Sequence, residues 1–445
     1  MTLWKAAQRP SLAPTEGRNH GASHGKSLRF PDRGGTLRSS GIRRLRGLPL
    51  LSGVHMSVSD PATSPPAALE RTPLHALHIS LGAKLVAFAG YDMPVQYATG
   101  VLAEHLHTRA AAGLFDVSHM GQAFLIGPDH QTVAQALERL CPADIIGLGH
   151  GRQRYTQLLN DDGGILDDLM VTRSADPSED GALMLIVNAA CKTADFAHIE
   201  QSLPENVSLL RAPHRALVAL QGPQAAAVLA RHAPAVANMA FMSAISTKFD
   251  GLECHVSRSG YTGEDGYEIS IRADRVERLA RALLAEAEVK PIGLGARDSL
   301  RLEAGLCLYG HDIDVTTSPV EAGLVWSLGK RRRAEGEFPG AARVQRELTQ
   351  GASRVRVGIL PDGRAPAREG TEIIDAEGRH IGFVTSGGFG PSLNAPLAMG
   401  YVATEFAGVD TPVMLVVRGK PLPAKIVRMP FVPHNYHRTI SGTAT

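Results

Sequence analysis

The stretch Ser257–Ile271 constrains the fold most, because it bends the chain sharply between two runs of alternating apolar and polar residues. It contains Gly260, Gly263 and Gly266 together with three acidic residues and two tyrosines. Glycine allows left-handed backbone angles and close approach to a bound molecule, and carboxylates accept hydrogen bonds. Two interpretations are open at this point: a hairpin that holds a ligand, or an ordinary hairpin with a solvated tip.

The length of 445 residues allows two or three domains with sizeable cores. No apolar run approaches the roughly 18 residues needed to cross a bilayer, so the sequence predicts no membrane segment. The four cysteines lie about fifty or more residues apart, without the close pairs of a zinc site or redox motif. We expect reduced, mostly buried thiols at Cys141, Cys191, Cys254 and Cys307.

Positive charge is concentrated at the N-terminus. Residues 1–55 hold ten Lys or Arg and two acids, which leaves 36 basic and 42 acidic residues and a net charge of −6 for the remainder. A nucleic-acid-binding domain would need a basic face on folded structure, so we expect no nucleic-acid partner. The acid-poor arm resembles a mitochondrial transit peptide. We favour a disordered extension or a start at Met56, which predicts a cytoplasmic bacterial protein; a transit peptide would predict the mitochondrial matrix.

Short strands and single helices alternate from Thr72 to about residue 333. Thr72 followed by Pro73 predicts the capped start of a helix over 73–81. This mixture predicts an α+β fold with antiparallel sheets. From Arg354 onward only short strands with turn signals follow, which predicts a small β-barrel or sandwich of about eighty residues.

Two adjacent acids, Asp167 and Asp168, lie within an apolar run that begins at Ile165. In a strand they face opposite sides, each among apolar neighbours. A carboxylate held in an apolar cleft is a candidate for contacting a protonated nitrogen or moving a proton. The alternative is an edge strand with both acids at its wet end.

A third candidate is the helix that follows Gly293 and Gly295. It places Arg297 and Arg301 one turn apart, and Asp298 within reach of Arg301. A helix N-terminus together with a guanidinium favours an anionic ligand group. The alternative is a surface ladder of ion pairs. Phosphate-loop, dinucleotide and zinc-protease motifs, and the Gly-x-Ser-x-Gly elbow, do not occur in the sequence.

Five segments carry a family resemblance in chain order: Phe115–Gly121, Gly163–Leu169, Gly260–Glu268, Gly295–Glu303 and Met429–Tyr436. They resemble the aminomethyltransferase family, the T-proteins of the glycine cleavage system. The resemblance covers about 71–436, with Tyr91 where many members have Trp. It implies a three-domain cloverleaf: an extension over 1–70, a folate-binding region of two α+β subdomains over 71–333, and a C-terminal β-barrel over 354–436.

The resemblance also implies the reaction. An aminomethyl group on the lipoyl arm of H-protein gives its one-carbon unit to tetrahydrofolate and releases ammonia, with no metal. Asp168 matches the catalytic carboxylate and Glu268 the acid that bonds the pterin ring. Arg297 matches a folate contact, either on the glutamate tail or as a support for a carboxylate such as Asp298 or Glu268. The remaining expected folate-pocket residues are Tyr436, Asn188, Tyr155 and Met120.

Two other functions are compatible with the same plan. One is a related folate-dependent demethylase of a small methylated amine or sulfonium compound. The other is a folate-binding accessory protein without transfer chemistry. The Cys-centred signature of such accessory relatives does not occur here, and the Asp167–Asp168 pair argues against that function.

Overall fold

The computed structural model describes residues 68–438. The N-terminal arm, and with it the choice between extension and transit peptide, lies outside the described residues. Among residues 68–438, no helix is long and apolar enough to cross a membrane. The chain from Leu69 onward forms one compact unit, so the predicted division at 333 and 354 stays a prediction.

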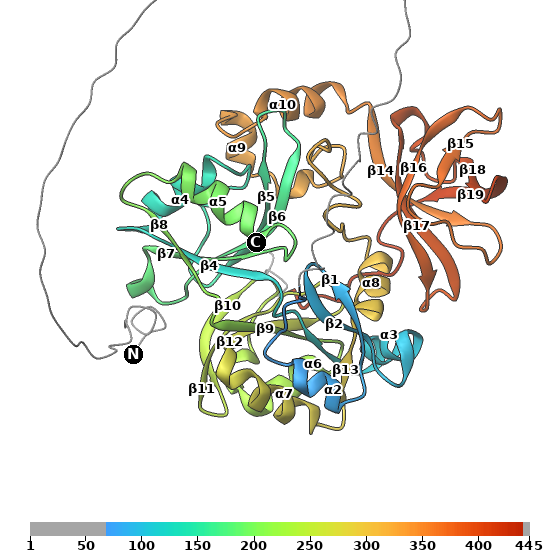
Figure 1. The fold of residues 1–445 in the computed structure, drawn as a ribbon. Helices are drawn as coiled ribbons and strands as arrows, with labels where there is room; N and C mark the ends of the chain where they lie inside the picture. Colours follow the sequence, from blue (N-terminus) through green and yellow to red (C-terminus); the bar gives the residue numbers. More distant parts are fainter. Residues whose placement is uncertain (1–67, 439–445) are drawn as a thin grey trace, which may run out of the picture. The chain divides into compact units, whose positions relative to one another are not determined.

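The first sheet has six strands in the order β10-β11-β12-β9-β3-β13 (Figure 1). All its pairings are antiparallel except that of β13 with β3. One face packs on helices α2, α6 and α7 around a core that includes Leu77, Val228 and Leu279. The strands are β3 (Ala112–Asp116), β9 (Arg215–Gln221), β10 (Ala244–Phe249), β11 (Leu252–Ser257), β12 (Gly266–Arg272) and β13 (Val289–Ile292), and the helices are α2 (His75–Ser80), α6 (Ala225–His232) and α7 (Val276–Leu284).

The second sheet is antiparallel and has five strands in the order β5-β6-β7-β4-β8. Its outer face packs on α4 and α5 through residues such as Val133, Leu169 and Ile199. The strands are β4 (Gly121–Ile126), β5 (Gln153–Leu159), β6 (Ile165–Arg173), β7 (Ala182–Val187) and β8 (Ser208–Arg211), and the helices are α4 (His130–Glu138) and α5 (Lys192–Ser202).

An apolar layer joins the inner faces of the two sheets. It contains Ile186 from the second sheet, Leu217 and Ala219 from the first, and Ala296 from helix α8 (Leu294–Glu303). Gln122 of β4 bonds Ser270 of β12 across this layer. The hairpin β1 (Lys84–Phe88) and β2 (Tyr91–Gln96) and helix α3 (Gly100–Ala110) precede β3 in the chain. The two sheets therefore pack face to face through this layer.

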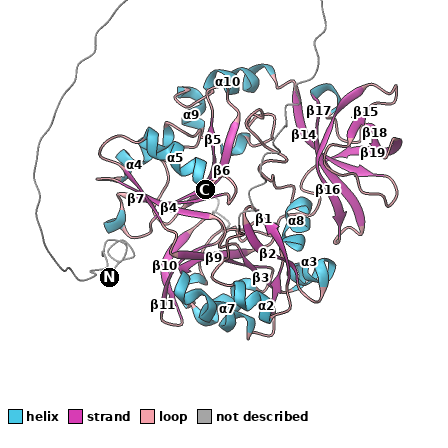
Figure 2. Cartoon of the chain, viewed as in Figure 1, coloured by secondary structure: helices cyan, strands magenta, loops and turns pink. Residues whose placement is uncertain are grey.

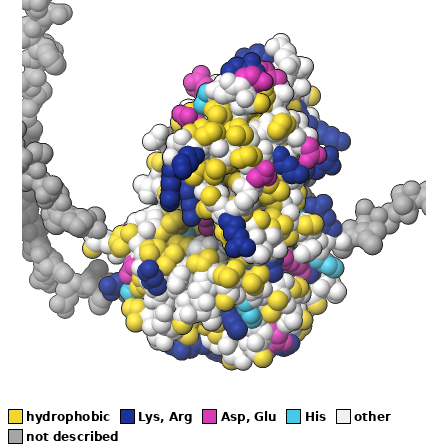
Figure 3. Space-filling view, turned by 90° about the vertical axis from the view of Figure 1, so that its right-hand side faces the viewer, with side chains coloured by type: hydrophobic (Ala, Val, Ile, Leu, Met, Phe, Trp, Pro, Cys, Tyr) yellow, Lys and Arg dark blue, Asp and Glu magenta, His cyan; other side chains and the backbone are white. Residues whose placement is uncertain are grey.

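The C-terminal part is a closed barrel in the order β14-β17-β16-β15-β18-β19, seen as separate strands in Figure 2. Its core includes Ile359, Val402 and Leu415. The barrel also exposes Phe383 and Phe389, and hydrophobic side chains lie between Lys and Arg side chains on the face in Figure 3. The strands are β14 (Arg354–Pro361), β15 (Glu372–Ile374), β16 (His380–Gly390), β17 (Ala395–Ala403), β18 (Pro412–Val417) and β19 (Lys420–Val427), and α9 (Lys330–Glu335) and α10 (Ala341–Gln350) precede them.

The predicted fold class, α+β with antiparallel sheets and a small C-terminal β-barrel, is confirmed. One local prediction is wrong. Thr72 does not cap α2, which begins at His75 with no side-chain cap. Its hydroxyl instead donates to Asp116 Oδ2 at 2.6 Å, because a buried carboxylate needs hydrogen-bond donors.

Candidate active site

Asp168 lies on β6, which is paired on both sides by β5 and β7. The edge-strand alternative is therefore wrong. Burial alternates along β6 as the sequence predicts, with Asp167 fully buried against the α5 side and Asp168 partly buried on the opposite face. Asp168 shares that face with Met170, which packs into the layer between the sheets. Its carboxyl thus faces the inside of the protein.

The surroundings of Asp168 favour its protonated form at neutral pH more than water does. Burial, and then the charge of Asp167, raise the pKa of Asp168 to about 7, against the lowering effect of hydrogen bonds from Tyr155 and Asn188. Asn188, directly after β7, donates from Nδ2 to Asp168 Oδ1 at 2.7 Å. A carboxyl with such a pKa can both take and give a proton near neutrality.

Glu268 lies on β12, opposite Ala219 of β9 in the register, and so also faces the layer between the sheets. It is 8% exposed and accepts a hydrogen bond from Ser259 Oγ at 3.2 Å. Burial raises the pKa of Glu268, and the Arg297 charge and the Ser259 bond partly offset this. One carboxylate from each sheet therefore faces the same interior.

Arg297 on α8 is half-buried and adds a guanidinium group. Its Cζ lies 4.7 Å from the centre of the Tyr261 ring. Among the described residues, no carboxylate lies within ion-pair distance of Arg297, and Nη1 is buried without a hydrogen-bond partner. Burial lowers the pKa of Arg297, which the Glu268 charge opposes. Asp298 bonds Arg301 at 2.8 Å, as its spacing predicts, so the nearby carboxylate that acts on Arg297 is Glu268.

A carboxylate of the protein itself occupies the N-terminus of α8. The Gly293 amide donates to Glu104 Oε2 at 2.8 Å, so the expectation that this helix end receives an anionic ligand group is not supported. Arg301 is only 3% exposed and pairs with buried Asp312 at 2.7 Å. The alternative of a surface ion-pair ladder on this helix is therefore wrong.

The bend between β11 and β12 does not have a solvated tip. Thr262 and Glu264 are buried, and the two acids of the bend are held within the protein. Arg109 Nη1 donates to Glu264 Oε1 at 2.9 Å, and Asp265 pairs with Arg258 at 2.5 Å. Of the three acids in the motif, Glu268 is the one that neither ion pair occupies, so its carboxylate can accept hydrogen bonds from a ligand.

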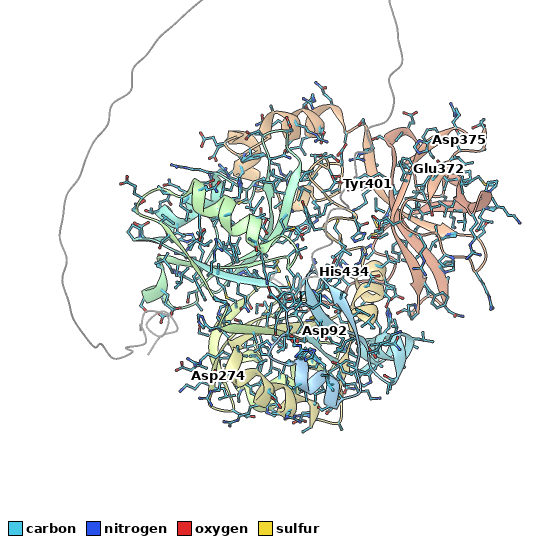
Figure 4. All side chains as sticks on the ribbon, viewed as in Figure 1. Asp92, Asp274, Glu372, Asp375, Tyr401 and His434 are labelled. Atoms are coloured by element: carbon cyan, nitrogen blue, oxygen red, sulfur yellow. The ribbon has the colours of Figure 1, made fainter. Side chains whose placement is uncertain are left out.

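Tyr436 belongs to the segment that follows the barrel. Its ring stacks on Phe241 with centroids 4.1 Å apart and an interplanar angle of 7°. His434, labelled in Figure 4, bonds the Ala304 carbonyl at 2.8 Å just after α8. Burial raises the pKa of Tyr436 to about 12, so its hydroxyl stays protonated and can donate a hydrogen bond.

Six of the seven residues singled out from sequence form two groups in the structure, and Tyr436 lies apart from both. Asp168, Asn188 and Tyr155 are joined by hydrogen bonds, and Met120 packs at the apolar layer nearby. Glu268 and Arg297 are coupled by charge. The Tyr436 ring contacts the rings of Phe241 and His434.

Sequence reasoning missed three neighbours of these residues: Asp195 beside Asp167, Tyr261 under Arg297 and Phe241 against Tyr436. Asp195 occurs in the first turn of α5, where an acid is usually explained by the helix dipole. Phe241 lies in a loop nearly two hundred residues before Tyr436, and no spacing could connect them.

Two known family domains match most of the described chain. Residues 74–332 match the family described as the GCVT N-terminal domain, and residues 354–433 match the glycine cleavage T-protein C-terminal barrel domain. The chain belongs to the glycine cleavage T-protein family. The family resemblance seen in the sequence is thereby confirmed.

Similar proteins of this family come from several organisms. The chain is 44% identical over 388 residues to the mitochondrial aminomethyltransferase of Dictyostelium discoideum, covering 83% of this chain and 94% of that protein. It is 45% identical to the human mitochondrial aminomethyltransferase, covering 83% and 91%. A crystal structure of aminomethyltransferase T from Bartonella henselae is 44% identical, with a TM-score of 0.78, covering 83% and 100%.

Membership in the T-protein family establishes the class of enzyme. The T-proteins are tetrahydrofolate-dependent transferases, so this chain is an enzyme, an aminomethyltransferase of the glycine cleavage system. Within residues 68–438, no group of three or more His, Cys, Asp or Glu side chains is arranged to hold a metal ion.

Proposed function

We propose that this enzyme transfers the one-carbon unit of an aminomethyl group, carried on the lipoyl arm of H-protein, to tetrahydrofolate. In this reaction the carbon loses its bonds to sulfur and to the amino nitrogen and gains bonds to N5 and N10 of the folate. The two folate N–H protons end on ammonia and on the dihydrolipoyl thiol. Such a transfer needs a group that accepts and returns protons next to the nitrogens.

The observation that carries this proposal is the inward-facing Asp168 with a pKa near neutrality. In the proposed mechanism its carboxylate meets the reacting folate nitrogens and moves protons as carbon is transferred. Asn188 and Tyr155 hold the carboxyl in place by hydrogen bonds. These three side chains are only partly exposed, which limits the water around them and strengthens the electrostatic contacts.

The polar groups that β12 and α8 contribute suit a polar, flat heterocycle. Glu268 is a buried acceptor for the amino and ring N–H groups of a pterin. Arg297 offers a buried Nη1 donor that lacks a partner among residues 68–438. We propose that Glu268 binds the pterin, that Arg297 supports Glu268 and donates to folate, and that Met120 and Tyr436 complete the pocket.

The test is Asp168→Asn, which keeps the size of the side chain and removes its charge. With lipoylated H-protein and tetrahydrofolate, we expect kcat to fall at least 100-fold, in line with the loss of one positioned proton-transfer group. Tetrahydrofolate binding should be retained. Wild-type turnover by this variant would overturn the assignment of Asp168.

The second candidate, a demethylase of a small methylated amine or sulfonium compound, shares the folate site. Product formation with H-protein left out separates the two. The proposed reaction predicts almost no turnover of a free small substrate, and rapid turnover would favour the demethylase.

The compartment follows from the N-terminus of the native protein. The relatives from Dictyostelium and human are mitochondrial by name, and the similar crystal structure is from a bacterium. We propose that the enzyme acts in the mitochondrial matrix if residues 1–55 are removed as a transit peptide, and in the bacterial cytoplasm otherwise. Mass spectrometry of the native N-terminus decides between them.

A further inference from the structure

A second buried carboxyl lies behind the proposed catalytic one. Asp195, in the first turn of α5, is 4% exposed. Within residues 68–438, no N–H or O–H group donates a hydrogen bond to its Oδ2. The group within hydrogen-bonding reach of Asp195 is the carboxyl of Asp167, which is 0% exposed. Two acids thus meet where water is excluded.

Two buried carboxylates in contact cannot both be ionised without a compensating cation. Within the described chain, no Lys, Arg or His forms an ion pair with either acid. Asp168 is a third acid close enough to act on the pair by its charge. The other ionisable groups near the pair are Cys191, just before α5, and Tyr309, and burial raises the pKa of both. Both are therefore neutral at pH 7, and the pair must hold a proton.

The donors around the pair decide which acid carries that proton. Asp167 accepts from the Asn188 amide N at 3.1 Å and from Asn188 Nδ2 at 2.9 Å. Burial raises the pKa of Asp167 as well, and these bonds oppose that effect by stabilising its ionised form. Asp195 lacks such donors, and burial followed by the Asp167 charge raises its pKa to about 9. The proton therefore belongs on Asp195, where it can be donated to the Asp167 carboxylate.

Asn188 connects this pair to the candidate site. The same Nδ2 group that bonds Asp167 Oδ1 also donates to Asp168 Oδ1 at 2.7 Å and to the Asp168 carbonyl at 3.2 Å. The orientation of the amide thus depends on an ionised, fixed Asp167. Tyr155, on the neighbouring strand, bonds the Asp168 carboxyl from another side.

We propose that Asp195 is a positioning residue that stays protonated and, by donating its proton to Asp167, fixes Asn188 and through it the carboxyl of Asp168. This inference rests on the proposed role of Asp168. It adds a chain of three side chains, from Asp195 through Asp167 to Asn188, that holds the reacting group without touching substrate.

Two variants separate this role from its alternatives. Asp195→Asn retains a donor and carries the same charge as a protonated acid. We expect kcat within about threefold of wild type and an unchanged midpoint in the pH profile. Asp195→Leu has no donor, and we expect kcat to fall about tenfold or more while the KM for H-protein changes little. Circular dichroism checks that both variants are folded.

Three results would overturn the proposal. A midpoint displaced to lower pH in Asp195→Asn would show that wild-type Asp195 is ionised. An equal loss of kcat in the two folded variants would show that the hydrogen-bond donor at position 195 does not matter. Wild-type activity in Asp195→Leu would show that the Asp195 side chain is not needed at all.

An infrared measurement without substrate tests the proton separately from the proposed function. We expect the C=O stretch of a protonated carboxyl at pH 8, where Asp168 with its pKa of about 7 is mostly ionised, in the wild type and in Asp168→Asn, and its loss in Asp195→Asn. If this band is found while H-protein-dependent turnover is not, the proton pair stands and the proposed function fails. If the band is missing from a wild-type enzyme that is active, the proposed shared proton of Asp195 and Asp167 is wrong, and the proposed function is unaffected.

Discussion

Asn435 and Glu264 join the C-terminal segment to the bend between β11 and β12: Asn435 Nδ2 donates to Glu264 Oε2 at 3.0 Å. The backbone adds a second bond, from the Asn435 amide to the Gly263 carbonyl at 2.8 Å. The other Glu264 oxygen is held by Arg109. The residue after Asn435 is Tyr436, so this connection sets where the proposed folate contact lies.

Asn435→Ala is expected to weaken tetrahydrofolate binding. A hydrogen bond to a charged group contributes about 1.5–3 kcal/mol, and partial exposure reduces this value. We expect the KM for tetrahydrofolate to rise roughly tenfold, since about 1.4 kcal/mol corresponds to a factor of ten, with kcat at saturation nearly unchanged. His437→Ala is the matched control, because His437 is bonded through its backbone carbonyl to the Phe241 amide. Equal KM values in the two variants would contradict this role.

Much of the fold follows from periodicity in the sequence. The alternation from Ile165 onward predicts opposite faces for Asp167 and Asp168, and the structure confirms it because β6 is an interior strand with both faces covered. The barrel follows from short strands with turn signals. These features are determined by residues that are close together in the sequence, so they can be predicted from one sequence.

The rest depends on contacts between distant segments. Asp195 looks like a solvated acid at a helix start, and only the packing of α5 on β6 makes it a partner of Asp167. Glu104 fills the N-terminus of α8 from 189 residues away. Burial and long-range partners, which decide the charge of an acid, are not encoded in local spacing.

The pair Arg301–Asp312 is expected to be important for stability. Both side chains are nearly fully buried, and Asp312 also accepts from Ser386 of the barrel at 2.9 Å. Removing one partner leaves an uncompensated buried charge, which costs about 3–5 kcal/mol. We expect Arg301→Met to lower the free energy of unfolding by that amount in urea titration. Arg272→Met, at an exposed pair with Asp274, should change it by less than about 1 kcal/mol. Similar losses would contradict the difference in burial.

Asp168→Asn is expected to stabilise the enzyme while it removes activity. The folded-state pKa of Asp168 is raised to about 7, against about 3.9 in the unfolded chain. Folded protein therefore binds the proton more tightly, and wild-type stability falls as pH rises from about 4 to about 7. The variant lacks this fall. We expect its advantage in the free energy of unfolding to be larger at pH 8 than at pH 5, by on the order of 1 kcal/mol. A gap that does not depend on pH would show that Asp168 is not desolvated.

Asp116 should show the opposite dependence on pH. Burial alone would raise its pKa, but hydrogen bonds from His78, Ser118 and Thr72, with the His78 charge, lower it. A lowered folded-state pKa means that the stabilisation is present above the unfolded value of about 3.9 and is lost as pH falls through the folded value. Asp116→Asn should therefore be less stable than wild type at pH 7, by roughly 1–3 kcal/mol for the lost charged hydrogen bonds.

The deficit of Asp116→Asn should shrink as pH falls below the unfolded value of about 3.9, and it should vanish below the folded-state pKa, where the wild-type carboxylate is protonated in both states. Denaturant titrations from pH 3 to pH 7 measure this difference. Asp274→Asn is the control, because Asp274 is exposed and its loss leaves the buried network intact. A deficit in Asp116→Asn that stays constant across this range would mean that packing, and not the charge of Asp116, stabilises the contact between α2 and the end of β3.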